Sequence, residues 1–242
     1  MSRSRAMNFA LSCAVIFCML AFASGGARAA IVFAEDFSDN SAGWLMWGEW
    51  QIGPATASTG QSFGNPDPSF DHTPTSDNGV AGIVIGGNPA TSVRLDYVYL
   101  ISPAVDVIDP YGATGKVTLD YYRWLNSDYP PYMYSTIDVA SNGSFDWVNI
   151  YTPLSPVGVV DDTWTLHSLD ISAFISYHLR IRFGFAIFEP GAFAVSSWNI
   201  DDITISNEAV AAPVPLPAAL PLFAASLAAM GFMGWRKRRK AT

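Results

Sequence analysis

Four carboxylate residues have the chemistry of a cation site: Glu35, Asp71, Asp201 and Asp202. Calcium takes about six to eight oxygen ligands, mixed from carboxylates and carbonyls. Glu35 belongs to the first expected strand, Asp71 to a long loop, and the two adjacent aspartates to the last expected strand. The carboxylates converge if the first and last strands pair. The alternative is that they are ordinary carboxylates of strand ends and loops.

The parity of the last strand gives a further expectation. Asp201 has the same parity as the apolar residues Ile203 and Ile205, which predicts that its side chain points inward. A carboxylate there would need a partner. Asp202 is expected to point the other way, unless a turn reverses it.

A second candidate site is aromatic. Residues 128–134 form an expected loop that carries Tyr129, Tyr132 and Tyr134. Flat exposed rings can stack on sugars, so the sequence suggests a sugar-binding loop here. The alternative is that rings of this kind fill the core, where aromatic side chains bury a large area.

Catalysis has little support. The three histidines, His72, His167 and His178, are scattered, and no Gly-x-Ser-x-Gly, His-Glu-x-x-His or Gly-x-Gly-x-x-Gly motif occurs. We therefore expect a protein that is not an enzyme. The alternative is a carbohydrate-active enzyme that acts on extracellular polysaccharide.

The charges are divided sharply along the chain. All 21 acidic residues lie between Glu35 and Glu208, whereas only five of the 13 basic residues do. This segment therefore carries a formal charge of −16, against −8 for the whole chain. A domain this acidic repels nucleic acid, so we expect no nucleic-acid partner. It also contains no cysteine, because Cys13 and Cys18 both precede it.

Period-two alternation and turn residues predict an all-β antiparallel sandwich of the jelly-roll type for residues 30–208. In residues 178–188, the pattern places Ile181 and Phe183 inward and Arg180 and Arg182 outward. The first and last strands are expected to pair. Residues 53–78 show no periodicity and are expected to form a long surface loop. Nine or more strands are expected, among them 31–37, 80–85, 92–101, 116–124, 135–139, 147–151, 163–169, 178–188 and 198–206.

The N-terminus has the pattern of a secretory signal peptide. Arg3 and Arg5 precede an apolar core at residues 9–22, and a small-x-small cleavage signal ends at Ala29. Residues 1–29 are therefore expected to form a signal helix that signal peptidase removes between Ala29 and Ala30.

The C-terminus has three parts in a fixed order. After a linker at 209–213, a short motif comes first: Val214, Pro215, Leu216, Pro217 and Ala218. Residues 218–235 carry no charge and are about long enough for a transmembrane helix. Residues 236–240 are all basic, which predicts that this end stays on the cytoplasmic side.

This tail resembles the PEP-CTERM sorting signals of Gram-negative bacteria, in their VPLPA form. The resemblance covers residues 214–240. It implies an exosortase that recognises the motif and processes the tail. It also implies a precursor held transiently in the inner membrane, followed by the cell surface or the extracellular matrix.

Several segments in order resemble the MAM-like family of extracellular β jelly rolls. They are 35–37, 43–44, Trp50, 68–73, 79–85, 100–104, 119–124, 137–139 and 198–203. The resemblance implies adhesion or ligand binding, but no single ligand. Polysaccharide or another surface protein is the partner that we expect. In jelly rolls of this kind a structural calcium ion often connects the first strand, an early loop and the last strand. The resemblance also implies a structural role for His72, which lies in the Asp71-His72-Thr73 segment.

Overall fold

The computed structural model describes residues 29–108, 114–153 and 155–209. Within them the chain forms twelve strands and one short 3-10 helix, Ser172–Phe174. The strands are β1 (Ala29–Glu35), β2 (Leu45–Met46), β3 (Trp50–Pro54), β4 (Gly79–Ile83), β5 (Leu95–Ile101), β6 (Thr114–Ser127), β7 (Met133–Ala140), β8 (Val148–Tyr151), β9 (Val159–Val160), β10 (Thr165–Asp170), β11 (Arg180–Ile187) and β12 (Trp198–Ala209).

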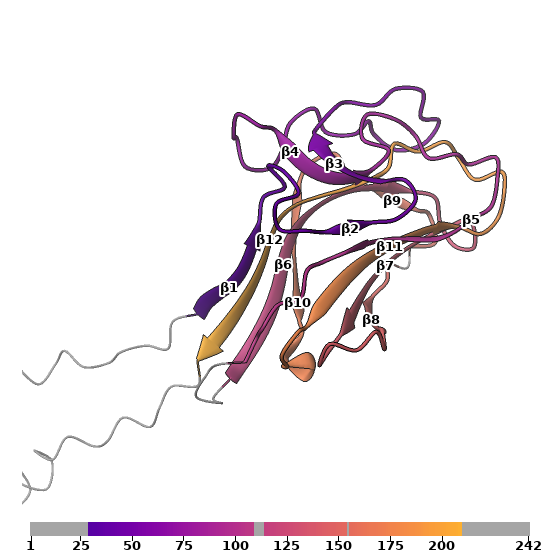
Figure 1. The fold of residues 1–242 in the computed structure, drawn as a ribbon. Helices are drawn as coiled ribbons and strands as arrows, with labels where there is room; N and C mark the ends of the chain where they lie inside the picture. Colours follow the sequence, from indigo (N-terminus) through magenta and orange to yellow (C-terminus); the bar gives the residue numbers. More distant parts are fainter. Residues whose placement is uncertain (1–28, 109–113, 154, 210–242) are drawn as a thin grey trace, which may run out of the picture. The chain divides into compact units, whose positions relative to one another are not determined.

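The predicted all-β sandwich is confirmed (Figure 1). The seven-stranded sheet has the order β10-β6-β12-β4-β3, with β1 also paired to β12 and β9 to β6. The five-stranded sheet has the order β2-β5-β11-β7-β8. The expected pairing of the first and last strands is also confirmed, because β1 runs antiparallel to β12 from Ala29 opposite Glu208 to Glu35 opposite Ile203.

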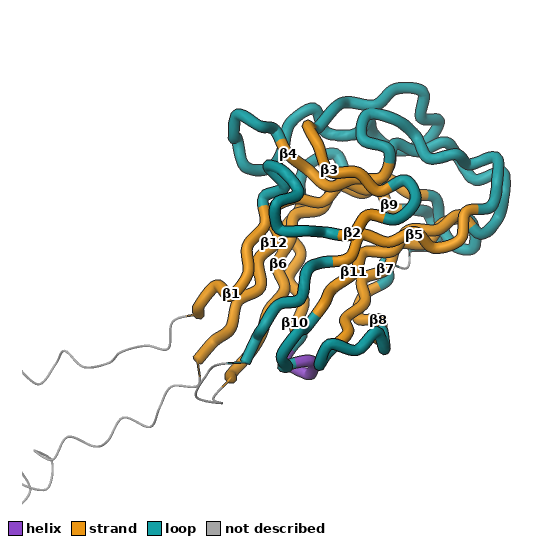
Figure 2. The backbone as a smooth tube through the Cα atoms, viewed as in Figure 1, coloured by secondary structure: helices purple, strands orange, loops and turns teal. Residues whose placement is uncertain are grey.

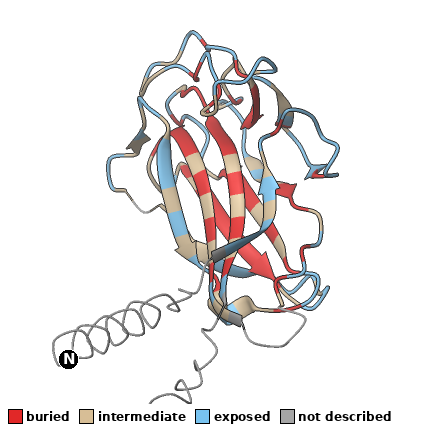
Figure 3. Cartoon of the chain, turned by 90° about the vertical axis from the view of Figure 1, so that its left-hand side faces the viewer, coloured by how far each residue is buried: buried red, intermediate tan, exposed pale blue. Residues whose placement is uncertain are grey.

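The strand patterns explain how each sheet buries one face. In β11, Ile181, Phe183 and Phe185 are buried, as the alternation predicts, and Arg180 and Arg182 lie on the opposite face. In β6, Leu119 and Tyr121 are fully buried in the same way. Figure 3 shows the resulting bands of buried and less buried residues along the strands.

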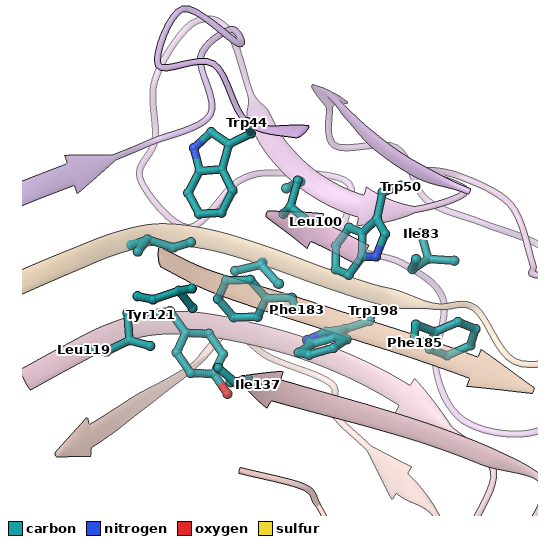
Figure 4. Close-up of a cluster of buried hydrophobic side chains, with 14 of the residues drawn as sticks. Trp44, Trp50, Ile83, Leu100, Leu119, Tyr121, Ile137, Phe183, Phe185 and Trp198 are labelled. Atoms are coloured by element: carbon teal, nitrogen blue, oxygen red, sulfur yellow. The ribbon is translucent and has the colours of Figure 1, made fainter. Parts of the chain in front are cut away.

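An aromatic cluster fills the space between the two sheets (Figure 4). Phe183 of β11 lies 5.7 Å from the Trp198 ring of β12 and 5.5 Å from the Tyr121 ring of β6, measured between ring centroids. Trp50 reaches Trp198 at 5.7 Å from β3. These contacts hold the sheets together in a domain that has no cysteine.

The long loop belongs to the group of loops around β3, β4 and β9 (Figure 2), and it contacts side chains of β12 and β6. Its ordered position depends on Asp67, which is buried and accepts hydrogen bonds from the Ser197 hydroxyl at 2.8 Å and from the Asn199 amide at 2.6 Å. The Trp124 indole of β6 donates to the Pro66 carbonyl at 3.0 Å. Because β12 and β6 supply these partners, the loop is fixed across two neighbouring strands. β3 takes up the first residues of the segment that was expected to be loop.

The signal helix, the sorting motif at 214–218, the transmembrane segment at 218–235 and the basic tail at 236–240 lie outside the described residues. Ala29 and Ala30, the expected cleavage site, are the first residues of β1. In the part of the chain that the structure describes, no helix has the length and apolar character needed to cross a membrane.

Candidate ligand-binding face

Two of the predicted cation ligands, Asp201 and Asp202, lie at a β-bulge in β12. The sequence did not predict this bulge. The pairing of β12 with β6 shifts between Asp201 and Thr204, and Asp202 has a φ of 46°. Ile200 and Ile203 therefore both face the core. Asp201 does not point inward as predicted. It is buried on the outer face of the seven-stranded sheet, in the row of Tyr122 and under the long loop.

The bulge brings Asp201 and Asp202 against the same loop residues. The His72 backbone N–H donates to Asp201 Oδ2 at 2.7 Å, and His72 Nδ1 lies 2.6 Å from Asp202 Oδ2. The Thr73 hydroxyl donates to the same Asp202 oxygen. The His72 ring stacks on Tyr122 with 3.3 Å between centroids. These contacts give His72 a structural part in holding the loop.

Burial raises the pKa of Asp201 to about 8, and the like charges of Asp202 and Asp71 contribute. Asp71 is also buried and accepts a hydrogen bond from the Thr75 hydroxyl at 2.7 Å. The structure thus gathers three of the four predicted carboxylates around one place. A bound cation would relieve the repulsion between them.

Glu35 has other partners. Its Oε1 accepts from the Phe37 backbone N–H at 2.9 Å, and its Oε2 accepts from the Trp44 indole at 2.8 Å. It shares an open pocket of about 630 Å³ with Asp36, Asp120 and Asp202. Among the described residues, no group of three or more His, Cys, Asp or Glu side chains is arranged to hold a metal ion. Calcium binding by the four carboxylates stays a prediction.

The open face of the five-stranded sheet carries a different constellation. One row of paired residues crosses all five strands, from Leu45 through Ile101, Arg182 and Asp138 to Asn149. Arg182 Nε donates to Asp138 Oδ2 at 2.8 Å, and the Asn149 amide donates to Asp138 Oδ1 at 2.9 Å. These hydrogen bonds fix the side chains of Arg182, Asp138 and Asn149 relative to one another.

Two aromatic rings enclose the guanidinium of Arg182. Its Cζ lies 4.0 Å from the centroid of the Tyr99 ring and 4.4 Å from that of Trp147. Gly184 lies directly opposite Tyr99, and a Cβ there would come within 2.8 Å of the Tyr99 ring. The absence of a side chain at Gly184 thus allows the Tyr99 ring to lie close to β11.

Further rings extend this surface. Tyr97 stacks beside Tyr99 at 5.8 Å, and both Tyr97 and Tyr134 contact the Phe188 ring, at 5.3 and 5.1 Å. Burial raises the pKa of Tyr97 to about 12. All these rings are partly exposed. We call the set the aromatic platform: Tyr97, Tyr99, Tyr134, Trp147, Arg182 and Phe188.

The predicted tyrosine loop contributes only in part. Tyr134 belongs to the platform, whereas Tyr132 packs against the core and Tyr129 contacts Tyr132 at 5.3 Å. None of the three rings is fully exposed. The other platform residues were missed. Their signal was present in the outward position of Arg182 and in the spacing of Tyr97 and Tyr99, which places both on one face of a strand.

The histidines lie in three separate environments. His72 belongs to the long loop and contacts β12. His167 stacks on the buried Tyr121 at 5.4 Å, and His178 is exposed beside Asp106. Burial lowers the pKa of His167.

No protein-family model matches the sequence, and no curated protein matches it either. Several solved structures are similar to this chain. The CBM22-1–GH10 modules of a Clostridium thermocellum endo-1,4-β-D-xylanase, complexed with xylohexaose, match with 16% identity and a TM-score of 0.37, over 73% of this chain and 28% of that chain. A cleaved adhesin domain of Lys-gingipain from Porphyromonas gingivalis matches with 16% identity and a TM-score of 0.40, over 74% and 97%.

A third structure is SGBP-B from a xyloglucan utilization locus of Bacteroides uniformis, with 13% identity and a TM-score of 0.46 over 72% of this chain and 49% of that chain. The chain thus spans less than a third of the xylanase structure and about half of SGBP-B.

Proposed function

We propose that the domain is a non-catalytic polysaccharide-binding module of an exported protein, and that the aromatic platform is its binding surface. The observation that carries this proposal is the fixed position of Arg182. Tyr99 and Trp147 enclose its guanidinium, and Asp138 anchors its Nε atom at 2.8 Å.

The chemistry of the platform suits a sugar chain. A pyranose presents C–H groups on its faces and hydroxyl groups around its edge. Partly exposed rings can pack against the C–H groups, because aromatic side chains bury apolar area at little cost in conformational freedom. Arg182 and Asn149 offer polar groups whose geometry is already set by their hydrogen bonds to Asp138.

The shape of the surface favours a polymer over a small molecule. The row from Leu45 to Asn149 crosses the whole sheet; Ile101 and Asp138 within it are buried, whereas Leu45 at its end and the neighbouring Trp47 are 55% and 58% exposed. Adjacent strands are about 4.8 Å apart, so a row of five spans roughly 19 Å. Titration of the purified domain with soluble polysaccharides, by calorimetry and affinity electrophoresis, tests the proposal. Absence of binding to every polymer would refute it.

We also propose that the chain is sorted to the cell surface or matrix through its VPLPA-type tail. Support comes from the order of motif, apolar segment and basic cluster in residues 214–240. Deletion of the exosortase should change the size and the location of the protein in cell fractions. An unchanged protein would refute this part.

A third proposal is that calcium stiffens the domain at Asp71, Asp201 and Asp202, with Glu35 nearby in β1. The burial of Asp71 and Asp201 beside other carboxylates supports it. The ion would favour the charged form of Asp201, whose pKa is raised by burial and by the neighbouring Asp202 and Asp71.

A further inference from the structure

The few cations of this acidic domain are concentrated at one face. Residues 30–208 contain five basic side chains, Arg94, Lys116, Arg123, Arg180 and Arg182, against 21 acidic ones. Arg123 is buried and paired with Asp161 at 2.8 Å, so its charge is neutralised inside the domain. Lys116 belongs to β6 in the seven-stranded sheet. The three remaining arginines all contact aromatic rings at the five-stranded sheet.

Each of these arginines lies over a ring. Arg182 lies between Tyr99 and Trp147, Arg180 is 5.4 Å from the Phe145 centroid, and Arg94 is 5.5 Å from that of Phe188. A guanidinium over an aromatic face is weakly hydrated and held in place, and its N–H groups remain free to bind a ligand.

The arginines differ in how far their charge is compensated. Arg94 is paired with Asp96 through two largely exposed side chains, and Arg182 is paired with the buried Asp138 through Nε alone. The terminal nitrogens of Arg182 have no hydrogen-bond partner among the described residues. Arg180 forms neither an ion pair nor a side-chain hydrogen bond within the described part of the chain.

Arg180 and Arg182 point to the same face of β11, about 6.6 Å apart along the strand. Two guanidinium groups with unused N–H donors are a pair of carboxylate receptors, because a planar guanidinium matches a carboxylate in a bidentate geometry. Most of the molecule would repel an anion, which makes this arrangement selective for a ligand that can use it.

Building on the proposed function, we propose that the platform, together with the neighbouring Arg180 and Phe145, binds an acidic polysaccharide, one whose sugars carry carboxylate groups. Arg180 and the terminal nitrogens of Arg182 bind the carboxylates, and the rings of Tyr99, Trp147 and Phe145 pack against the sugar faces. The long-range repulsion from the rest of the domain slows association at low salt, while the local pairs supply the selectivity.

The test compares acidic polymers with their own uncharged forms. Polygalacturonate, alginate and hyaluronate are each titrated into the domain, in parallel with the methyl-esterified or carboxyl-reduced polymer of the same backbone. We expect at least one acidic polymer to bind about tenfold or more tightly than its uncharged form, as the loss of one charged hydrogen-bonded contact predicts.

Variants then locate the recognition. Arg180→Gln should weaken binding of the acidic polymer about tenfold and weaken binding of the uncharged form much less, so that the difference between the two forms shrinks, whereas Arg180→Lys should keep part of the difference. Lys116→Gln removes the same charge from the other sheet and serves as the matched control, with affinity unchanged. Circular dichroism confirms that each variant is folded.

The outcomes separate the two proposals. Equal affinity for the acidic and uncharged forms, or an Arg180→Gln variant that binds both as the wild type does, would overturn the acidic-ligand inference and leave the platform as a sugar-binding surface. Absence of binding to any polymer, charged or neutral, would overturn both. Binding to sulfated polymers alone, without any carboxylate polymer, would also overturn the inference as stated.

Discussion

The guanidinium carbon of Arg182 lies 4.0 Å from the centroid of the Tyr99 ring, and Gly184, directly opposite Tyr99, places no side chain between the two strands. Asp138 holds the guanidinium from the other side at 2.8 Å. The position of this one arginine thus depends on β5, β7 and β11 together.

Gly184 is expected to be essential for the platform. A Cβ there would lie 2.6 Å from Thr136 Oγ1 and 2.8 Å from the Tyr99 ring, so Gly184→Ala must displace Tyr99. Polysaccharide affinity should fall about tenfold as stacking and the Arg182 contact are lost. Gly53→Ala is the control, because a Cβ at Gly53 has no neighbour within 4 Å. Calorimetry measures both. Unchanged affinity in Gly184→Ala would show that the Tyr99 position does not matter.

The aromatic core predicts a large loss of stability on truncation. Phe183 is fully buried between Tyr121 and Trp198, and Phe183→Ala should lower the free energy of unfolding by about 3 to 5 kcal/mol. Phe145 is 67% exposed, so Phe145→Ala should change it by less than about 0.5 kcal/mol. Urea denaturation distinguishes the two. Similar values for both variants would contradict the observed core.

The buried carboxyl group of Asp67 should make the free energy of unfolding depend on pH. Burial raises its pKa from 3.8 to about 6, against the opposing effect of hydrogen bonds from Ser197 and Asn199. Because the folded-state pKa is the higher one, the folded state binds the proton more tightly. The stabilisation is fully present below pH 3.8 and is lost as the pH rises to about 6.

The corresponding variant isolates this contribution. Each pKa unit corresponds to about 1.4 kcal/mol, so the loss attributable to Asp67 is roughly 3 kcal/mol. Asp67→Asn should reduce the slope of the unfolding free energy between about pH 4 and pH 6, measured by urea titration, and the slope that remains belongs to groups such as Asp201, whose pKa is raised to about 8. Asp162→Asn, at an exposed carboxylate, should retain the wild-type slope. A wild-type slope in Asp67→Asn would show that Asp67 is not the titrating group.

Calcium should raise the melting temperature. At a free concentration about 100 times the dissociation constant, a bound ion adds about 2.7 kcal/mol, which corresponds to roughly 5 to 10 °C for a domain of this size. Differential scanning fluorimetry with calcium and with chelator measures the shift. Asp71→Asn should abolish it, and Asp162→Asn should not. A melting temperature that chelator and calcium leave unmoved would rule out the site.

The sequence predicted the fold well where one pattern dominates. The alternation in β6 and β11 specified which side chains enter the core, and both strands form as expected. Strands such as β2, with two residues, carry no pattern long enough to detect. They form because the neighbouring sheet edge supplies hydrogen-bond partners.

The candidate sites were harder to predict, for two physical reasons. The bulge at Asp202 reverses the parity of β12, and no residue type in the sequence requires a left-handed conformation there. The platform combines Tyr99, Asp138 and Arg182, which are far apart in the sequence and meet only through strand pairing. The alternation within each strand indicates the face on which a platform residue lies. Only the order of the strands in the sheet shows which of these residues are neighbours.

The most direct test of the account is the polysaccharide affinity of Trp147→Ala. Trp147 covers the Arg182 guanidinium at 4.4 Å, whereas Leu166 is a 52% exposed apolar residue on β10 of the other sheet. Calorimetry with the polymer that the wild-type domain binds should show a loss of affinity of about tenfold or more for Trp147→Ala and wild-type affinity for Leu166→Ala. Wild-type affinity in Trp147→Ala, with the variant folded, would contradict the platform as the binding surface.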